Sequence, residues 1–308
     1  MNIKEFRINE HLTLRLEGEQ TNIYVDDYYF QGCKYLLLDI GIENASKYDS
    51  IESIDEAMEI YSKEHEHNRT ILDPETEFWG HCSNIQVWAE NNYDTRLLDS
   101  RLAFPLLKRL AEAGDPLAMA MFKEEVIKRL ESGYHSVVLY LLKRNFLEYF
   151  TLEEIEAIEI TPREKTLKRM TDYGDVWYEL GYEYHRHSEY DKARKCFERA
   201  HKYLSEAIET SPHVAYVWNR FGNVYYFLGD HEKEDQCYDQ AIALNPHYFD
   251  PWYNKACIQS IRNNTEKTLE YLEKAITLNP NVKERAKNDP DLIKMQSLEE
   301  FKTLLEYK

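Results

Sequence analysis

The sequence lacks the features that mark several common classes of protein. No stretch approaches the roughly 18 consecutive apolar residues of a membrane-spanning helix. The first residues, MNIKEFRINEH, contain neither the apolar run nor the small-residue cleavage site of a signal peptide. Glycine is scarce, at 10 of 308 residues, and no glycine-rich phosphate loop occurs. These absences predict a cytoplasmic protein with no membrane partner and no cofactor.

Basic residues are also in short supply. The chain has 38 Lys and Arg residues against 56 Asp and Glu residues, which gives a formal net charge of −18. Proteins that bind nucleic acid hold its phosphates with clustered Lys and Arg. The charge balance therefore predicts no nucleic-acid partner.

The cysteines do not form a recognisable framework. They are five in number, widely separated, and no two have the CxxC spacing of a metal or redox site. This pattern predicts reduced thiols, and the cysteines of the C-terminal half are expected in the core, where a small apolar side chain is usual. The five are Cys33, Cys82, Cys196, Cys237 and Cys257.

What the sequence does contain is a repeat. One pattern of about 34 residues occurs three times, in copies that begin at Gly174, Ala215 and Phe249, and Pro246 and Pro280 close the second and third copies. Large and small residues recur in register, which predicts three pairs of antiparallel helices. The recurring positions hold Trp177, Trp218 and Trp252; Gly181, Gly222 and Ala256; Phe197, Tyr238 and Leu272; and Ala200, Ala241 and Ala275.

This pattern resembles the tetratricopeptide repeat over about residues 172–305. The resemblance implies an α-solenoid, and the apolar residues Phe301, Leu304 and Leu305 fit the capping helix that such an array needs to cover its last repeat. The third copy departs from the pattern, because Lys255 and Gln259 stand where apolar and aromatic residues are expected. We therefore expect a degenerate third repeat.

The resemblance also implies a ligand-binding groove, lined by the first helix of each pair. A clamp for a terminal carboxylate is not expected, because Tyr178 and Asn219 stand where such clamps carry lysine. Aromatic rings provide contact area at small entropic cost, although some of them could instead pack between repeats. The register implies several groove positions on each first helix, Phe227 among them. The residues selected from these positions as the binding set are Tyr178, Tyr182, Arg186, Tyr216, Asn219, Asn223, Tyr226 and Tyr253.

The N-terminal half reads as two further parts. A hairpin is predicted at 12–25, because apolar residues alternate at 12–17 and run together at 23–25, on either side of a Glu-Gly turn. The apolar run at 33–40 fits a third strand or a short buried helix. Helix starts at Asp73-Pro74 and Asp115-Pro116 belong to a segment that resembles armadillo and HEAT-type helix pairs. Four parts are predicted. Residues 1–50 contain a small hairpin or sheet, 51–160 form a helical bundle or an α-solenoid, 161–171 form a linker, and 172–308 contain the three repeats with their capping helix.

The stretch from Glu77 to Leu98 carries the most unusual sequence of this half. It resembles a block in uncharacterised archaeal repeat proteins, which implies a structural module with no assigned chemistry. His81 and Cys82 invite a catalytic reading, but adjacent residues on a helix point about 100° apart. We expect Cys82 in a buried stripe with Phe78, Ile85 and Ala89, and His81 at its edge.

Metal sites are not predicted either. His65 and His67 are two residues apart, so they face different sides of a helix, and no HExxH motif is present. With no catalytic or metal-ligating set, the sequence predicts a non-enzymatic, mainly α protein.

Three hypotheses of function follow from the sequence. The first is a scaffold or adaptor that binds a peptide or helix of another protein in the concave groove of the repeats. The second is an enzyme or enzyme subunit with a site in the N-terminal half. The third is a structural homo-oligomer assembled through the repeat array.

Overall fold

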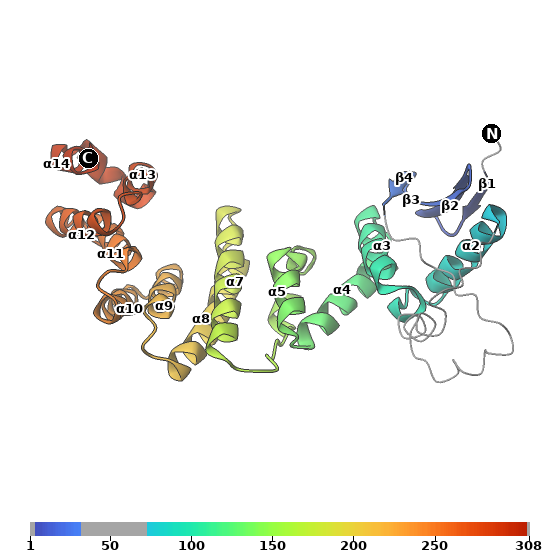
Figure 1. The fold of residues 1–308 in the computed structure, drawn as a ribbon, viewed down its shortest axis with the longest axis horizontal. Helices are drawn as coiled ribbons and strands as arrows, with labels where there is room; N and C mark the ends of the chain where they lie inside the picture. Colours follow the sequence, from blue (N-terminus) through green and yellow to red (C-terminus); the bar gives the residue numbers. More distant parts are fainter. Residues whose placement is uncertain (1–3, 32–72, 307–308) are drawn as a thin grey trace. The chain divides into compact units, whose positions relative to one another are not determined.

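The protein is described by a computed structural model that covers residues 4–31 and 73–306 (Figure 1). It consists of two compact units, Met1–Lys128 and Arg129–Lys308. The boundary lies near the end of the helix α4 (Pro116–Glu131).

The first unit begins with an antiparallel sheet in which four strands follow one another in sequence order. Leu12 pairs with Val25 and Leu14 with Ile23, and all four side chains are buried on one face. The central hairpin confirms the one predicted from the sequence, whereas the apolar run at 33–40 lies outside the described residues. The strands are β1 (Lys4–Arg7), β2 (Leu12–Glu17), β3 (Gln20–Val25) and β4 (Tyr28–Phe30).

Helices follow the sheet, and their starts are as the sequence predicted. The side chain of Asp73 accepts hydrogen bonds from the first turn of α2, and Asp115 accepts from the backbone N–H groups of Leu117 and Ala118 at 2.9 and 3.0 Å. The described helices of this unit are α2 (Pro74–Glu90), η2 (Thr95–Leu97), α3 (Ser100–Ala113) and α4 (Pro116–Glu131).

One detail of α2 differs from the prediction. Phe78, Cys82 and Ile85 are buried as expected, but Trp88 completes the stripe and Ala89 is only half-buried. His81 is buried rather than at the edge, because its Nε2 lies 3.1 Å from Glu77 Oε1 and this polar partner makes its burial tolerable.

The second unit contains the three predicted helix pairs, which follow one another along the chain in Figure 1. The first pair is longer than the others: α8 has 21 residues and α10 has 14, which accounts for the longer step between the first two copies. The pairs are α7 (Leu167–Arg186) with α8 (Tyr190–Thr210), α9 (Ala215–Leu228) with α10 (His231–Leu244), and α11 (Phe249–Ile261) with α12 (Thr265–Leu278).

The small residues of the pattern sit where two helices of a pair approach. A Cβ atom added to Gly181 would lie 2.9 Å from the ring of Phe197, and one added to Gly222 would lie 2.5 Å from the ring of Tyr238. Both distances are shorter than van der Waals contact allows. Glycine is therefore required at these two positions by the aromatic ring opposite.

A shorter helical segment precedes the pairs and packs on the first of them. The guanidinium of Arg199 on α8 donates to the carbonyls of Ile155 and Ile158 at 2.7 and 2.6 Å, and the Tyr203 hydroxyl donates to Ile160 at 2.8 Å. The predicted linker at 161–171 also overlaps α7, which already begins at Leu167. The elements are α5 (His135–Lys143), η3 (Phe146–Tyr149) and α6 (Leu152–Ala157).

The C-terminal segment caps the array as predicted. Phe301 and Leu292 are buried in one cluster with Leu272 and Ile276 of α12. The capping elements are α13 (Val282–Asn288), η4 (Pro290–Ser297) and α14 (Glu299–Glu306). Within the ranges that the structure describes, no helix combines the length and apolar character that crossing a membrane requires.

Candidate functional site

A cavity of about 390 Å³ opens on the helix pairs. Side chains of the first helices α7, α9 and α11 line it, together with residues of α10, α13 and η4. We call it the array cavity. Five of the eight predicted groove residues lie in its wall: Tyr178, Tyr182, Arg186, Asn223 and Tyr226.

The other three predicted residues lie elsewhere. Tyr216 is exposed, and its hydroxyl donates to Asp175 at 2.5 Å and accepts from Arg220 Nε at 3.0 Å. Asn219 and Tyr253 are buried, so they pack between helices and offer no free surface. All three lie on the first helices, but the register carried no information on which positions later elements cover and which positions reach the cavity.

The aromatic wall of the cavity is organised around Phe227. Its ring stacks on Phe197, with centroids 4.4 Å apart and planes 8° apart, and the rings of Tyr178 and Tyr182 meet its edge or face at 5.9 Å. Such contacts hold aromatic side chains in fixed orientations. Burial raises the pKa of the Tyr226 phenol to about 12, so the hydroxyl stays neutral at physiological pH.

Asparagine side chains join the second and third pairs beside this wall. Asn254 Nδ2 donates to Asn219 Oδ1 at 3.1 Å and to Asn223 Oδ1 at 2.9 Å, and the Tyr238 hydroxyl also donates to Asn223 Oδ1 at 2.8 Å. Because the Asn223 oxygen accepts both bonds, its Nδ2 group is the donor available to a bound carbonyl.

Charged groups of both signs border the cavity. Arg186 is largely exposed and has Glu183 as a partner at 3.3 Å, while Arg285 stacks over the Tyr253 ring at 4.1 Å. On the η4 side, Asp289 accepts a hydrogen bond from the Tyr253 hydroxyl at 2.6 Å. Burial, and then the charge of Asp289, raises the pKa of the Asp291 carboxyl.

One group of side chains in the cavity has the composition of a metal site. Ligand atoms of Cys257, Asp289 and Asp291 all lie within 4.8 Å of one another. Burial, and then the neighbouring carboxylates, raises the pKa of the Cys257 thiol well above its ordinary value, so it does not offer a thiolate. With Asp289 also bound to Tyr253, the arrangement is a hydrogen-bonded cluster.

Several residues of the cavity were not among those predicted. Arg285, Asp289 and Asp291 come from the C-terminal capping segment, which has no repeat register from which to place them. Phe227 lies in the cavity wall at a groove position that the register implied, although the set of eight residues did not include it.

The cysteine of α2 in the first unit, Cys82, is not a reactive thiol. Burial raises the pKa of Cys82 to about 12, so the protonated form dominates at physiological pH. His81 pairs with Glu77, four residues earlier on the same helix. His65 and His67 lie outside the described residues.

This fold is a helical repeat array. Its antiparallel helix pairs have small residues at their contacts, and the first helices of the pairs line a cavity. Sequence comparison identifies its family: tetratricopeptide repeat families match residues 172–247 and 237–270. This part of the chain is a tetratricopeptide repeat array. Over 60 residues the chain is also 32% identical to the tetratricopeptide repeat-containing protein trd-1 of Caenorhabditis elegans, a match that covers 20% of this chain and 8% of that protein.

Solved structures of other repeat proteins are distantly similar. The tetratricopeptide repeat protein TTC0263 of Thermus thermophilus is 18% identical, with 72% of this chain and 95% of that chain covered and a TM-score of 0.36. YrrB, described as having an unusual peptide-binding site, is 17% identical, with coverages of 79% and 98% and a TM-score of 0.34. The first repeat domain of Spaghetti (RPAP3), bound to an HSP90 peptide, is 16% identical, with coverages of 44% and 91% and a TM-score of 0.28.

Arrays of this family build extended surfaces from successive repeats and use them for binding. The general function that the family match supports is therefore that of a protein-interaction scaffold.

Proposed function

We propose that the protein binds a peptide or a helix of another protein in the array cavity. The observation that carries this proposal is the convergence of aromatic and polar side chains from α7 and α9 on one hollow. Tyr182 and Tyr226 supply rings, Asn223 supplies an amide donor, and Arg186 supplies a positive charge. A volume of about 390 Å³ suits one or two side chains of a bound segment.

The four groups suit different parts of a peptide. Apolar side chains of the ligand fill the space beside the rings, since aromatic anchors dominate the energetics of many interfaces. The amide of Asn223 binds a backbone carbonyl, because its oxygen is already used within the array. Arg186 extends into solvent and binds an acidic side chain with its charged fork.

The proposal is tested with peptides selected on the full chain from a random peptide library. The variant Tyr182→Ala/Tyr226→Ala should weaken the selected peptides by about 30-fold, which corresponds to about 2 kcal/mol for two anchor rings. Fluorescence anisotropy measures the affinity, and circular dichroism checks that helical content is unchanged.

The matched control removes two tyrosines that are at least as exposed but lie outside the cavity. Tyr28 is 70% and Tyr140 is 54% exposed, against 44% for Tyr182. Tyr28→Ala/Tyr140→Ala should leave the affinities unchanged. Selected peptides that bind the cavity variant as tightly as the wild type would show that recognition takes place on another surface.

A further inference from the structure

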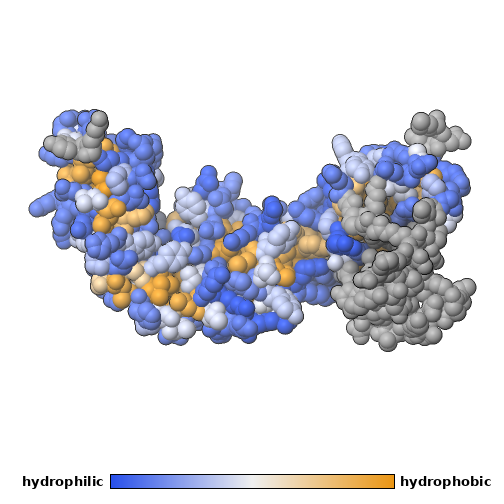
Figure 2. Space-filling view, in the orientation of Figure 1, coloured by the Kyte–Doolittle hydropathy of each residue, from blue (hydrophilic) through white to orange (hydrophobic). Residues whose placement is uncertain are grey.

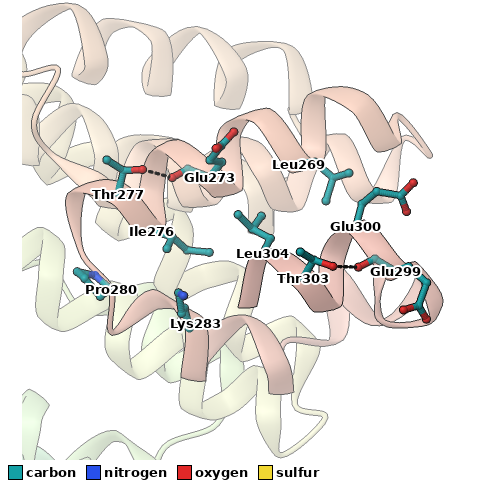
Figure 3. A pocket seen from close by; sticks show the side chains of 10 residues that line it. All are labelled: Leu269, Glu273, Ile276, Thr277, Pro280, Lys283, Glu299, Glu300, Thr303 and Leu304. Carbon is teal, nitrogen blue, oxygen red and sulfur yellow. Dashed lines mark hydrogen bonds between the residues drawn. The ribbon is translucent and has the colours of Figure 1, made fainter. Parts of the chain in front are cut away.

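A second and larger cavity lies at the C-terminal end of the array. Its volume is about 820 Å³, and α12, α13 and α14 enclose it (Figure 3). We call it the terminal groove. Ile276 and Leu304 face each other across its middle in Figure 3, and none of its lining residues belongs to the array cavity.

The terminal groove exists because the cap is shorter than the helix it covers. In the preceding pairs, the next first helix has 14 residues in α9 and 13 in α11. Its counterpart after α12, the helix α13, has only seven residues. At 1.5 Å per residue α13 spans about 10 Å against about 21 Å for α12.

The uncovered part of α12 presents one face to the groove. Leu269, Glu273 and Ile276 are spaced by four and three residues, which places them on the same side of a helix. Figure 2 shows hydrophobic residues between α12 and α14, bordered by hydrophilic ones. The groove thus has the apolar floor and polar border of a helix-binding site.

The charge of the border has one dominant sign. The lining contains three glutamates and one lysine, Lys283. Glu299 is paired with Lys302 at 2.6 Å. Glu273 and Glu300 are exposed, and over residues 4–31 and 73–306 neither forms an ion pair. A partner that carries positive charge beside its apolar face complements this border.

We propose that the terminal groove docks an amphipathic basic helix of a partner protein, in the place where a further repeat would continue the array. Two or three apolar side chains of that helix fill the space above Ile276 and Leu304. Its Lys or Arg residues pair with Glu273 and Glu300. A second copy of this chain is a poor occupant, because its net charge of −18 would oppose the acidic border.

The test uses a designed probe. A fluorescein-labelled peptide of about 18 residues carries leucine at helical spacing and lysine at the other positions, and a matched peptide carries glutamate in place of lysine. The lysine peptide should bind the full chain with a Kd tighter than about 100 μM, and the glutamate peptide should not. Fluorescence anisotropy at two salt concentrations measures both.

Two variants with the same change in net charge locate the binding. Glu273→Lys/Glu300→Lys reverses the border of the groove and should weaken the lysine peptide by about 10-fold while allowing the glutamate peptide to bind. Glu266→Lys/Glu270→Lys changes exposed residues of α12 outside the lining and should leave the affinity within about 2-fold. Thr303→Trp fills the groove without a change of charge and should also block the peptide.

The opposing outcomes are distinct. If the lysine peptide does not bind, the groove is not a docking site and the proposal is overturned. An equal loss of affinity in the control variant would also overturn it, because the peptide would then be attracted to the acidic chain in general. A doubled mass in sedimentation that Thr303→Trp abolishes would identify a second copy as the occupant and would also overturn it. Because the two cavities share no lining residue, Tyr182→Ala/Tyr226→Ala leaves this result unchanged.

Discussion

The second and third helix pairs have different residues at the point where their two helices approach most closely. In the second pair Gly222 lies against the buried ring of Tyr238. In the third pair the corresponding residues are Ala256 and Leu272, both buried in one apolar cluster. A larger residue on one helix thus goes with a smaller one on the other. The comparison teaches that the volume at the contact, rather than glycine itself, is what a helix pair requires.

The largest expected effect comes from breaking this match in the second pair. Gly222→Leu should lower the free energy of unfolding by about 3 kcal/mol, because even a Cβ at this position overlaps the Tyr238 ring. Urea denaturation followed by circular dichroism measures the change. Unaltered stability would show that α9 and α10 do not meet at Gly222.

A compensating substitution sharpens the same test. Gly222→Ala/Tyr238→Leu gives the second pair the residues of the third. The loss of unfolding free energy in the double variant should therefore be about 1 kcal/mol smaller than the sum of the losses in the two single variants. If the two single costs simply add, the volume match is not what links these positions.

The contacts between successive first helices differ as well. Arg220 of α9 pairs with Asp175 of α7 at 3.0 Å, whereas Asn254 of α11 meets α9 through neutral amide contacts. The ion pairs between the second and third helix pairs lie elsewhere, between Lys255 and the carboxylates of α10. Burial already raises the pKa of the Asp175 carboxyl despite this partner. The charge of the Asp175 carboxylate, at the contact between α7 and α9, therefore depends on Arg220.

Removing the partner at each contact should reveal the difference. Arg220→Met should destabilise the chain by about 2 kcal/mol, because the half-buried Asp175 carboxylate loses its cationic partner and keeps the hydrogen bond from the Tyr216 hydroxyl. Asn254→Ala should cost about 1 kcal/mol, since only neutral hydrogen bonds are lost. Thermal denaturation of both variants compares them, and equal costs would contradict the distinction.

The smallest expected effect concerns two neighbours on α10. Burial raises the pKa of Glu234, although His231 pairs with it at 2.9 Å. Burial alone would also raise the pKa of Asp235, but Lys255 at 2.7 Å and Arg262 at 3.3 Å hold it below its ordinary value. The two carboxyls should therefore give stability opposite dependences on pH.

The sign follows from linkage. The raised pKa of Glu234 favours the folded state at low pH, and this contribution is lost as the pH rises above the ordinary value of 4.5. Glu234→Gln should therefore stabilise the chain near pH 7 relative to wild type and not in acid. Asp235→Asn should destabilise near pH 7, with the difference vanishing as the pH falls below 3.8. Urea denaturation across this range measures both, and parallel pH profiles would contradict the assignment.

The sequence predicted what short-range patterns encode. The helix pairs and the caps at Asp73 and Asp115 follow from short-range sequence patterns, and the resemblance to the tetratricopeptide repeat implied five residues that line the array cavity. Lys255 looked like a defect of the third repeat. It is instead neutralised by Asp235 and Asp239 of the preceding pair, at 2.7 and 2.6 Å, a match between distant positions that no local pattern displays.

Other features depend on contacts between segments that are far apart in the sequence. Arg285, Asp289 and Asp291 reach the array cavity because the capping segment folds back beside α11. The strand β4 has only three residues, and two of its tyrosines face solvent, so alternation gave no signal. The terminal groove arises from the short length of α13, which ends just before Asp289 and Pro290, but which part of α12 is then left uncovered depends on packing.

The buried cysteines of the first two helix pairs are probes of local opening. Cys196 lies in the first pair and Cys237 in the second, and both thiols are buried in the folded chain, whereas Cys257 of the third pair lines the array cavity. A thiol reagent can modify Cys196 or Cys237 only when its own pair opens, so their labelling rates in the unaltered protein report two local opening rates, and that of Cys257 reports access to the cavity. Mass spectrometry of the labelled peptides can thus show whether the first two pairs open separately or as one unit.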